Sequence, residues 1–143
     1  MSHVLIIGGG LSGCTAASEL SAYCSYVTIV EKTDRVGGKV RNYGCKATDK
    51  CNNCGVCLTG GLWEKVENAP NVDILYNSKL VDLTGKIGDF SAVINTPADM
   101  MCINGISNVV AATGFEGSSA CSGHLQIEGK QGIIRGLELE GLC

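Results

Sequence analysis

Three glycines near the start of the chain constrain its fold more than any other feature. Gly8, Gly10 and Gly13 follow the apolar run His3–Ile7 and precede a segment whose small and apolar residues have helical spacing. A β-branched run, Tyr26–Glu31, comes next. A strand, a glycine-rich turn, a helix and a second strand within about 30 residues form a βαβ unit. The sequence therefore predicts an α/β fold with a Rossmann-like parallel sheet.

The same glycines form the pattern G-x-G-x-x-G, in which each position has a physical role. Gly8 permits a tight turn, Gly10 lets the backbone approach a pyrophosphate, and Gly13 lets the helix pack closely on the strand. The helix N-terminus then offers free N–H groups to the phosphates. Glu31 follows 23 residues after Gly8, where a carboxylate accepts hydrogen bonds from ribose hydroxyls and repels a 2′-phosphate. We therefore expect a dinucleotide other than NADP; the alternative is a glycine-rich turn in an unrelated α/β domain.

Two later motifs bear on the choice between NAD and FAD. "DRVGGK" (Asp34–Lys39) resembles the R-x-G-G motif that follows the second strand in flavoproteins with two dinucleotide domains. "VVAATG" (Val109–Gly114) resembles the later A-T-G turn of those proteins. An NAD domain requires neither motif, so FAD is favoured.

Further elements are predicted between these motifs. They are a helix over Gly61–Ala69, strands over Asn71–Asn77 and Ile106–Gly114, and an antiparallel meander over Lys79–Gly85, Asp89–Thr96 and Met100–Gly105. We expect one FAD-binding domain over residues 1–114, and a weakly patterned C-terminal tail over residues 115–143 that forms an interface.

Four cysteines follow the R-x-G-G motif, in a loop over residues 44–58. Cys45, Cys51, Cys54 and Cys57 have the spacing C-x5-C-x2-C-x2-C. The run C-x2-C-x2-C is the core of the bacterial ferredoxin pattern, and the usual C-x3-C-P continuation is absent here. We interpret the segment as an inserted iron–sulfur loop that holds a [4Fe-4S] cluster, with Cys45 as the fourth ligand. Zinc is the main alternative, although structural zinc sites usually take two separated ligand pairs, and redox-active thiols are another.

The remaining chemically capable residues have a structural interpretation. Free cysteine commonly behaves as a small hydrophobe, which fits Cys14 in the first helix. Trp63 is expected to pack the short helix, with a flavin-facing role left open, and His124 is expected to lie in a loop. No nucleophile–base pair or general acid is found, so no catalytic residue is assigned.

Composition and charge exclude several classes of function. The net charge is −3 and no basic stripe is present, so nucleic-acid binding is not expected. No apolar run approaches ~18 residues, so no membrane span is expected. The N-terminus lacks the basic residues of a secretory signal. We therefore expect a cytoplasmic protein, in which nine cysteines are more often metal ligands than disulfides.

With both motifs in place, the chain resembles the flavin subunit of heterodisulfide reductase and its bacterial relatives. The matching stretches are "VLIIGGGLSGCTAASEL", "VEKTDRVGGKV", the cysteines followed by "NVDILYNSKLVDLTG", "NVVAATGFE" and "GKQGIIRGLELEGLC". The cysteines are the most specific part, because many flavoproteins share the glycine motifs.

The resemblance implies an electron-transfer subunit, with FAD wired to iron–sulfur clusters in a multisubunit oxidoreductase complex that relays or bifurcates electrons. It implies pyrophosphate contacts from Gly8, Gly10, Leu11, Ser12 and Gly13, ribose contacts from Glu31 and Lys32, flavin contacts from Gly38 and Lys39, an adenine contact from the Val81 backbone, and closure of the site by Thr113 and Gly114.

Family members continue into a second nucleotide domain, whereas this sequence ends where that domain would begin. We therefore expect activity only together with partners, either a longer flavin-subunit relative or iron–sulfur subunits. The alternative is a half-flavoprotein with a structural zinc site that serves as a non-catalytic scaffold or sensor.

Overall fold

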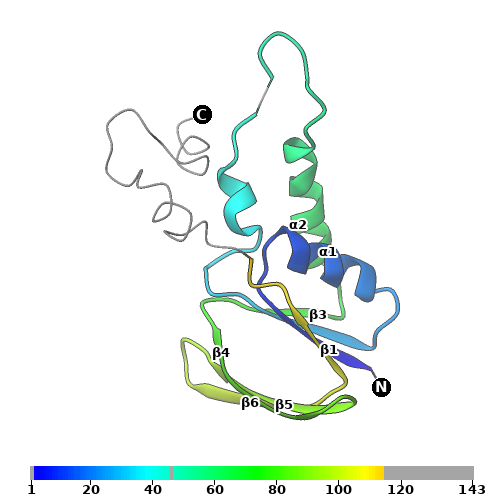
Figure 1. The fold of residues 1–143 in the computed structure, drawn as a ribbon, viewed down its shortest axis with the longest axis vertical. Helices are drawn as coiled ribbons and strands as arrows, with labels where there is room; N and C mark the ends of the chain where they lie inside the picture. The colour runs from blue at the N-terminus through cyan, green and yellow to red at the C-terminus, as the bar shows by residue number, and fades with distance from the viewer. Residues whose placement is uncertain (1, 46, 115–143) are drawn as a thin grey trace, which may run out of the picture.

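A parallel sheet forms the centre of the part of the chain that the computed structural model describes, residues 2–45 and 47–114 (Figure 1). The predicted tail and His124 lie outside these residues. The strands run in the order β3-β2-β1-β7, and each is parallel to its neighbours. Their bounds are β1 His3–Ile7, β2 Tyr26–Val30, β3 Val72–Leu75 and β7 Asn108–Ala111. The predicted βαβ unit and parallel sheet are confirmed.

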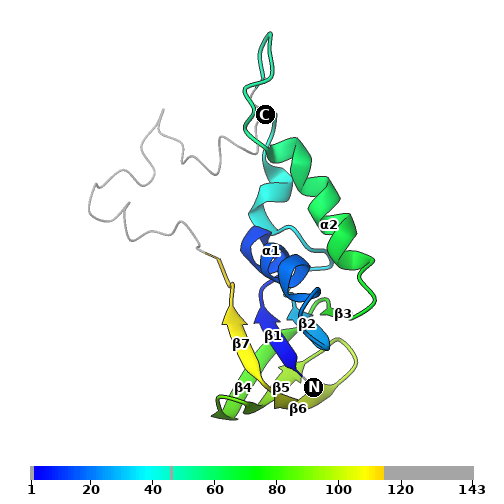
Figure 2. The same cartoon turned by 90° about the vertical axis from the view of Figure 1, so that its right-hand side faces the viewer.

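Two helices cover one face of this sheet, as Figure 2 shows. They are α1 (Leu11–Leu20) and α2 (Thr59–Glu67). Gly13, Cys14 and Ala17 are buried on α1, because small side chains let a helix approach a sheet closely. Trp63 of α2 is buried in one hydrophobic cluster with Cys14 and Ala17, which confirms its expected role in packing.

Helix α1 ends at Leu20, before the end of its small and apolar segment. The side-chain amide of Asn71 donates hydrogen bonds to the carbonyl oxygens of Ser21 and Cys24, at 2.8 and 3.0 Å. These carbonyls follow the last helical turn, where acceptors otherwise lack partners. A residue distant in the sequence thus caps the end of α1.

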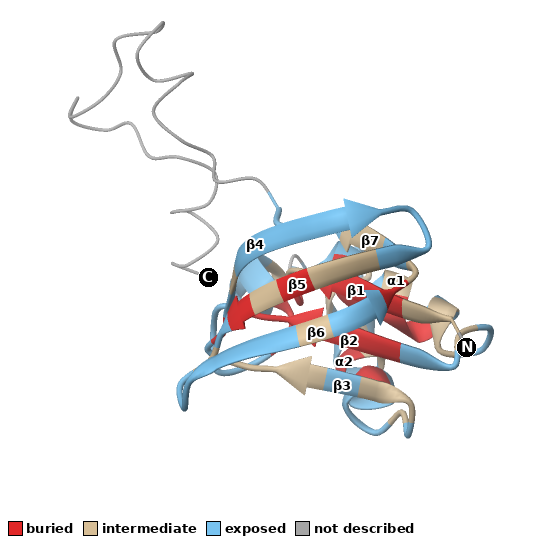
Figure 3. Ribbon diagram, turned by 90° about the horizontal axis from the view of Figure 1, so that it is seen from below, coloured by how far each residue is buried: buried red, intermediate tan, exposed pale blue. Residues whose placement is uncertain are grey.

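A three-stranded antiparallel sheet covers the other face. Its strands are β4 (Lys79–Lys86), β5 (Asp89–Asn95) and β6 (Met100–Ile106), in the order β4-β5-β6. Ala92 and Ile94 of the central strand are buried against the parallel sheet. Figure 3 shows this sheet from below, with buried residues along β5 and an exposed β4. The predicted meander is confirmed as this sheet.

The order of the strands in the parallel sheet reverses direction at β1. The chain passes from β1 through α1 to β2 on one side, and β7 pairs with β1 on the other. Such a switch point is where open parallel sheets bind ligands. None of the helices within the described ranges is long and apolar enough to cross a membrane.

Candidate dinucleotide site and cysteine loop

Two of the motif glycines are required by the protein itself. A Cβ atom at Gly8 would lie 2.4 Å from the carbonyl oxygen of Ala112, and the backbone there has φ +103°. A Cβ atom at Gly13 would lie 1.9 Å from the carbonyl oxygen of Gly8. The turn therefore packs backbone against backbone, and side chains are excluded at both positions.

Gly10 is different, because a Cβ atom there would meet no heavy atom within 4 Å. Its backbone, at φ −72° and ψ −171°, is accessible to any residue. Gly10 is the N-cap of α1, and no side chain caps this helix end. Open space beside uncapped amides fits a bound pyrophosphate, which needs close backbone approach and N–H donors. Leu11 and Ser12, in the first turn, are exposed on this edge.

The R-x-G-G motif packs directly against this turn. The Gly37 N–H donates to the carbonyl oxygen of Gly9 at 2.7 Å, and Gly37 forms a parallel bridge with Gly10. A Cβ atom at Gly38 would lie 3.1 Å from the Cα of Gly10. The two glycine motifs therefore form one continuous surface, which we call the glycine cradle (residues 8–13 and 37–38).

Glu31 joins the cradle to the end of β2. The carboxylate accepts hydrogen bonds from the Gly9 N–H at 2.7 Å and from the Thr33 N–H and hydroxyl, both at 2.8 Å. Glu31 is only 5% exposed. A carboxylate has about four acceptor sites, so one remains for a ribose hydroxyl. That Glu31 cross-links these segments was not predicted from the sequence. The available local signal was Thr33, a hydrogen-bond donor two residues after the carboxylate.

Other predicted cofactor residues lie along the same edge of the sheet. The Ser78 N–H donates to the carbonyl oxygen of Glu31 at 2.9 Å, which brings the start of β4 beside the end of β2. Val81 is exposed and lies at a bulge, so it has no partner residue on β5. Thr113 and Gly114 follow β7 and are exposed, as are Lys32 and Lys39.

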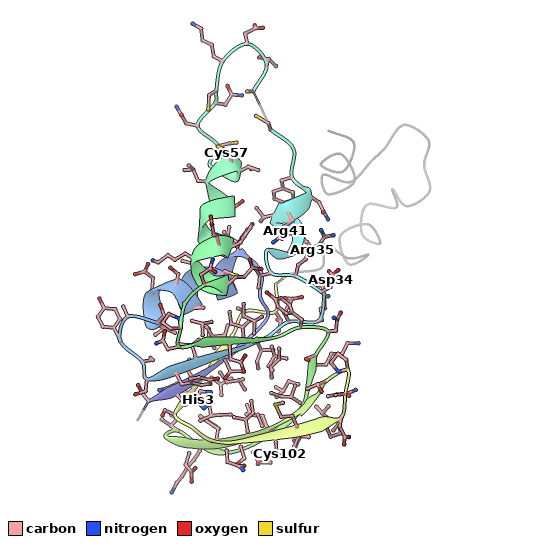
Figure 4. The ribbon with its side chains drawn as sticks, turned by 180° about the vertical axis from the view of Figure 1, so that it is seen from behind. His3, Asp34, Arg35, Arg41, Cys57 and Cys102 are labelled. Carbon is pink, nitrogen blue, oxygen red and sulfur yellow. The ribbon has the colours of Figure 1, made fainter. Side chains whose placement is uncertain are left out.

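The four predicted metal ligands line one hollow of about 240 Å³. Cys45, Cys51, Cys54 and Cys57 are all exposed, and Figure 4 shows Cys57 at the end of α2 that faces the loop. Within residues 2–45 and 47–114, no three His, Cys, Asp or Glu side chains are gathered as a metal-binding group. Four soft sulfur donors around a shared space fit a thiophilic metal group in their chemistry, although the side chains are not arranged as a ligand set.

We expect Cys14 to resist alkylation in the folded chain. Its side chain is fully buried, its S–H donates to the carbonyl oxygen of Gly9 at 3.2 Å, and burial raises its pKa to about 11. Because the thiolate is the nucleophile, iodoacetamide at about pH 8 should label exposed Cys102 and leave Cys14 unmodified. Peptide mass spectrometry before and after unfolding in urea measures this. Equal labelling of the two thiols in the folded chain would contradict the expectation.

Comparison with known proteins agrees with this geometry. Residues 6–72 match the family described as NAD(P)-binding Rossmann-like domain. The chain is 35% identical over 88 residues to the A subunit of the ferredoxin/F(420)H(2)-dependent CoB-CoM heterodisulfide reductase of Methanosarcina acetivorans, covering 62% of this chain and 11% of the relative. A protein of Archaeoglobus profundus that is described as like the A subunit of heterodisulfide reductase is 31% identical over 91 residues, covering 64% and 13%. The matched region is thus little more than a tenth of these relatives.

Solved structures share the fold. L-proline dehydrogenase from P. horikoshii matches with a TM-score of 0.62 and 26% identity, over 79% of this chain and 22% of its own. Thioredoxin reductase from Giardia duodenalis matches in fold with a TM-score of 0.54 and 20% identity, over 78% of this chain and 30% of its own. The N-terminal part of the chain is therefore a Rossmann-like dinucleotide-binding domain related to the A subunit of heterodisulfide reductase.

Proposed function

We propose that this domain binds FAD in the glycine cradle and a [4Fe-4S] cluster in the cysteine loop, and that it relays electrons between them as part of a multisubunit redox complex. One observation carries the proposal. The segment from Gly38 to Cys45 leaves the cradle as one 3-10 turn, η1 (Gly38–Asn42), and leads to the first cysteine of the hollow. Two cofactor sites joined by so short a segment suit electron transfer.

The choice of FAD rests on features that an NAD domain does not need. Gly37 and Gly38 pack on Gly10 within the cradle, and the antiparallel sheet is inserted between β3 and β7 along the chain. In this proposal, the first amides of α1 hold the pyrophosphate, Glu31 holds the adenosine ribose with Lys32 beside it, and the backbone of Val81 at its bulge meets adenine. Gly38 and Lys39, together with Thr113 and Gly114, lie toward the flavin.

The cluster would be held by Cys45, Cys51, Cys54 and Cys57. Bound FAD and the cluster would supply the electron chemistry, and the chain would bind both groups and fix their separation. Exposed apolar surface beside the cysteines supports a partner there: Leu58 is 75% exposed and also lines the hollow. Such a side chain suits contact with another protein of the complex, which could bring a further redox centre close to the loop.

The proposal is tested on protein purified anaerobically from its native source. We expect flavin absorption bands, a broad shoulder at ~400 nm, and about four iron and four sulfide per chain. Cys51→Ser and Cys54→Ser should each lose most of the iron. Cys102→Ser is the matched control, because Cys102 is exposed but lies on β6, outside the loop.

Each part of the proposal can fail separately in this experiment. Full iron in both loop variants would exclude the cluster assignment. A colourless protein containing zinc would favour the structural alternative, a scaffold or sensor. NAD without flavin in the denatured holoprotein, measured by mass spectrometry, would exclude FAD.

A further inference from the structure

Asn53 has an unusual backbone conformation inside the cysteine loop. Among the described non-glycine residues, only Asn53 and Asn77 have positive φ, both at 51°. Asn tolerates this left-handed region better than most residues, whereas a β-branched residue there is a genuine outlier. Asn53 is exposed, so burial in a packed core does not account for the conformation.

The conformation directs the amide of Asn53 at a predicted metal ligand. The Asn53 N–H donates to the Sγ of Cys51 at 3.4 Å, and the Cys51 S–H faces the Asn53 Oδ1 at 3.8 Å. A cysteine that binds a metal has lost its proton, so the second contact then has no hydrogen to share. The backbone amide remains as a donor to the sulfur. Both residues line the hollow.

We propose that Asn53 is a positioning residue for the metal group of the cysteine loop. Its left-handed backbone holds the amide against Cys51, which orients the sulfur within the hollow and stabilises it as a ligand. Loss of such an outer contact typically costs 10- to 100-fold in metal affinity, and hydrogen bonds to sulfur tune cluster potentials. The inference rests on the proposed function in one respect, that Cys51 binds a thiophilic metal group.

The test compares three variants of the full chain. Asn53→Gly keeps the left-handed backbone and the amide, whereas Asn53→Val disfavours both the conformation and the N–H···S contact. Asn77→Val is the matched control, because Asn77 has the same φ but donates its N–H to the carbonyl oxygen of Thr33, away from the loop. Co²⁺ is the probe, since its thiolate absorption reports binding to cysteine ligands whichever metal the protein holds naturally.

We expect Asn53→Val to bind Co²⁺ about 10- to 100-fold more weakly than the wild type, and Asn53→Gly and Asn77→Val to bind it as the wild type does. After reconstitution with iron and sulfide, the midpoint potential of Asn53→Val should be lower than that of Asn53→Gly, because a donor to sulfur stabilises the more negative, reduced cluster.

Equal Co²⁺ affinities across the Asn53 series would overturn the inference. A weaker affinity with an unchanged midpoint potential would overturn it as well, since distortion of the loop alone would explain that result. A wild-type chain that binds Co²⁺ but takes up no iron and sulfide excludes the proposed cluster, and the Co²⁺ series alone then decides the role of Asn53. A wild-type chain that binds no Co²⁺ overturns both proposals.

Discussion

Gly13→Ala should strongly destabilise the fold, whereas Gly10→Ala should leave the fold intact and weaken dinucleotide binding at least about tenfold. At Gly13 the new methyl group would lie 1.9 Å from the Gly8 carbonyl oxygen. That atom belongs to the backbone of the turn, so it cannot rotate away as a flexible side chain would. Overpacking typically costs about 1–3 kcal/mol and occasionally more, and a clash with backbone belongs at the upper end. That cost is a large part of the roughly 5–15 kcal/mol that stabilises a typical domain.

At Gly10 the methyl group would enter the open space that we assign to the pyrophosphate. The backbone conformation suits alanine, and restricting the unfolded chain stabilises by about 0.4–1 kcal/mol. Alanine is a poorer N-cap than glycine, so the two effects oppose each other and the free energy of unfolding should change by less than about 1 kcal/mol. The affinity for ADP, which carries the pyrophosphate of either dinucleotide, should fall at least about tenfold, or roughly 1.4 kcal/mol. Urea denaturation followed by circular dichroism and isothermal titration with ADP measure the two effects.

Gly61→Ala is the control for this pair. Gly61 lies in α2, and a Cβ atom there would meet nothing within 4 Å. Alanine should stabilise the helix by up to about 1 kcal/mol and leave ADP binding unchanged. A Gly10→Ala chain that binds ADP as the wild type does would exclude the assigned pyrophosphate position. A Gly13→Ala chain with the urea midpoint of the wild type would contradict the close approach of the turn to α1.

Glu31→Ala should weaken both the fold and the binding of the cofactor. The carboxylate satisfies the buried amide of Gly9 and two donors of Thr33. Leaving a buried N–H without its acceptor costs about 1–3 kcal/mol, so the urea midpoint should fall. Loss of a charged hydrogen-bond partner for ribose should lower FAD affinity by about 10- to 150-fold. The iron should largely remain, because these hydrogen bonds of Glu31 join β2 to the cradle and do not reach the cysteine loop.

Thr33→Val separates the two effects of Glu31. It removes the Thr33 hydroxyl, which contacts Glu31 and the carbonyl oxygen of Arg35, and keeps the N–H donor to Glu31. Stability should therefore fall by about 0.5–1.5 kcal/mol, while the carboxylate remains available to ribose. FAD titrations under conditions where each variant is fully folded give the affinities. A Glu31→Ala variant with wild-type FAD affinity would exclude the ribose contact, and one with an unchanged urea midpoint would exclude the cross-link between β2 and the cradle.

The elements of this domain were predictable from the sequence because their signals are local. The apolar run His3–Ile7 became β1 with the same bounds, and the segments broken by glycine became β4, β5 and β6. The roles of Gly8 and Gly13 were also predictable, since strand, tight turn and helix are adjacent in the chain. The order of motifs further favoured a parallel sheet with a meander laid on it.

Contacts between distant segments were not predictable in the same way. Asn71 caps the end of α1 through the carbonyls of Ser21 and Cys24. No local sequence pattern predicts that the helix ends at Leu20. The close approach of Gly38 to Gly10 depends on the path that the chain takes after β2. The hydrogen bond from the Gly9 N–H to Glu31 likewise requires the glycine turn to reach the end of β2.

The cysteine loop shows most clearly which features the sequence determines and which depend on the folded structure. The spacing of Cys45, Cys51, Cys54 and Cys57 by itself determined which thiols are candidates to act together, because short gaps keep them within one loop. Only the tertiary structure placed all four around one hollow at the end of α2 and turned the amide of Asn53 toward Cys51. Sequence spacing limits how far apart residues can lie, whereas the directions of side chains and amides follow from backbone conformation and from the packing that holds it.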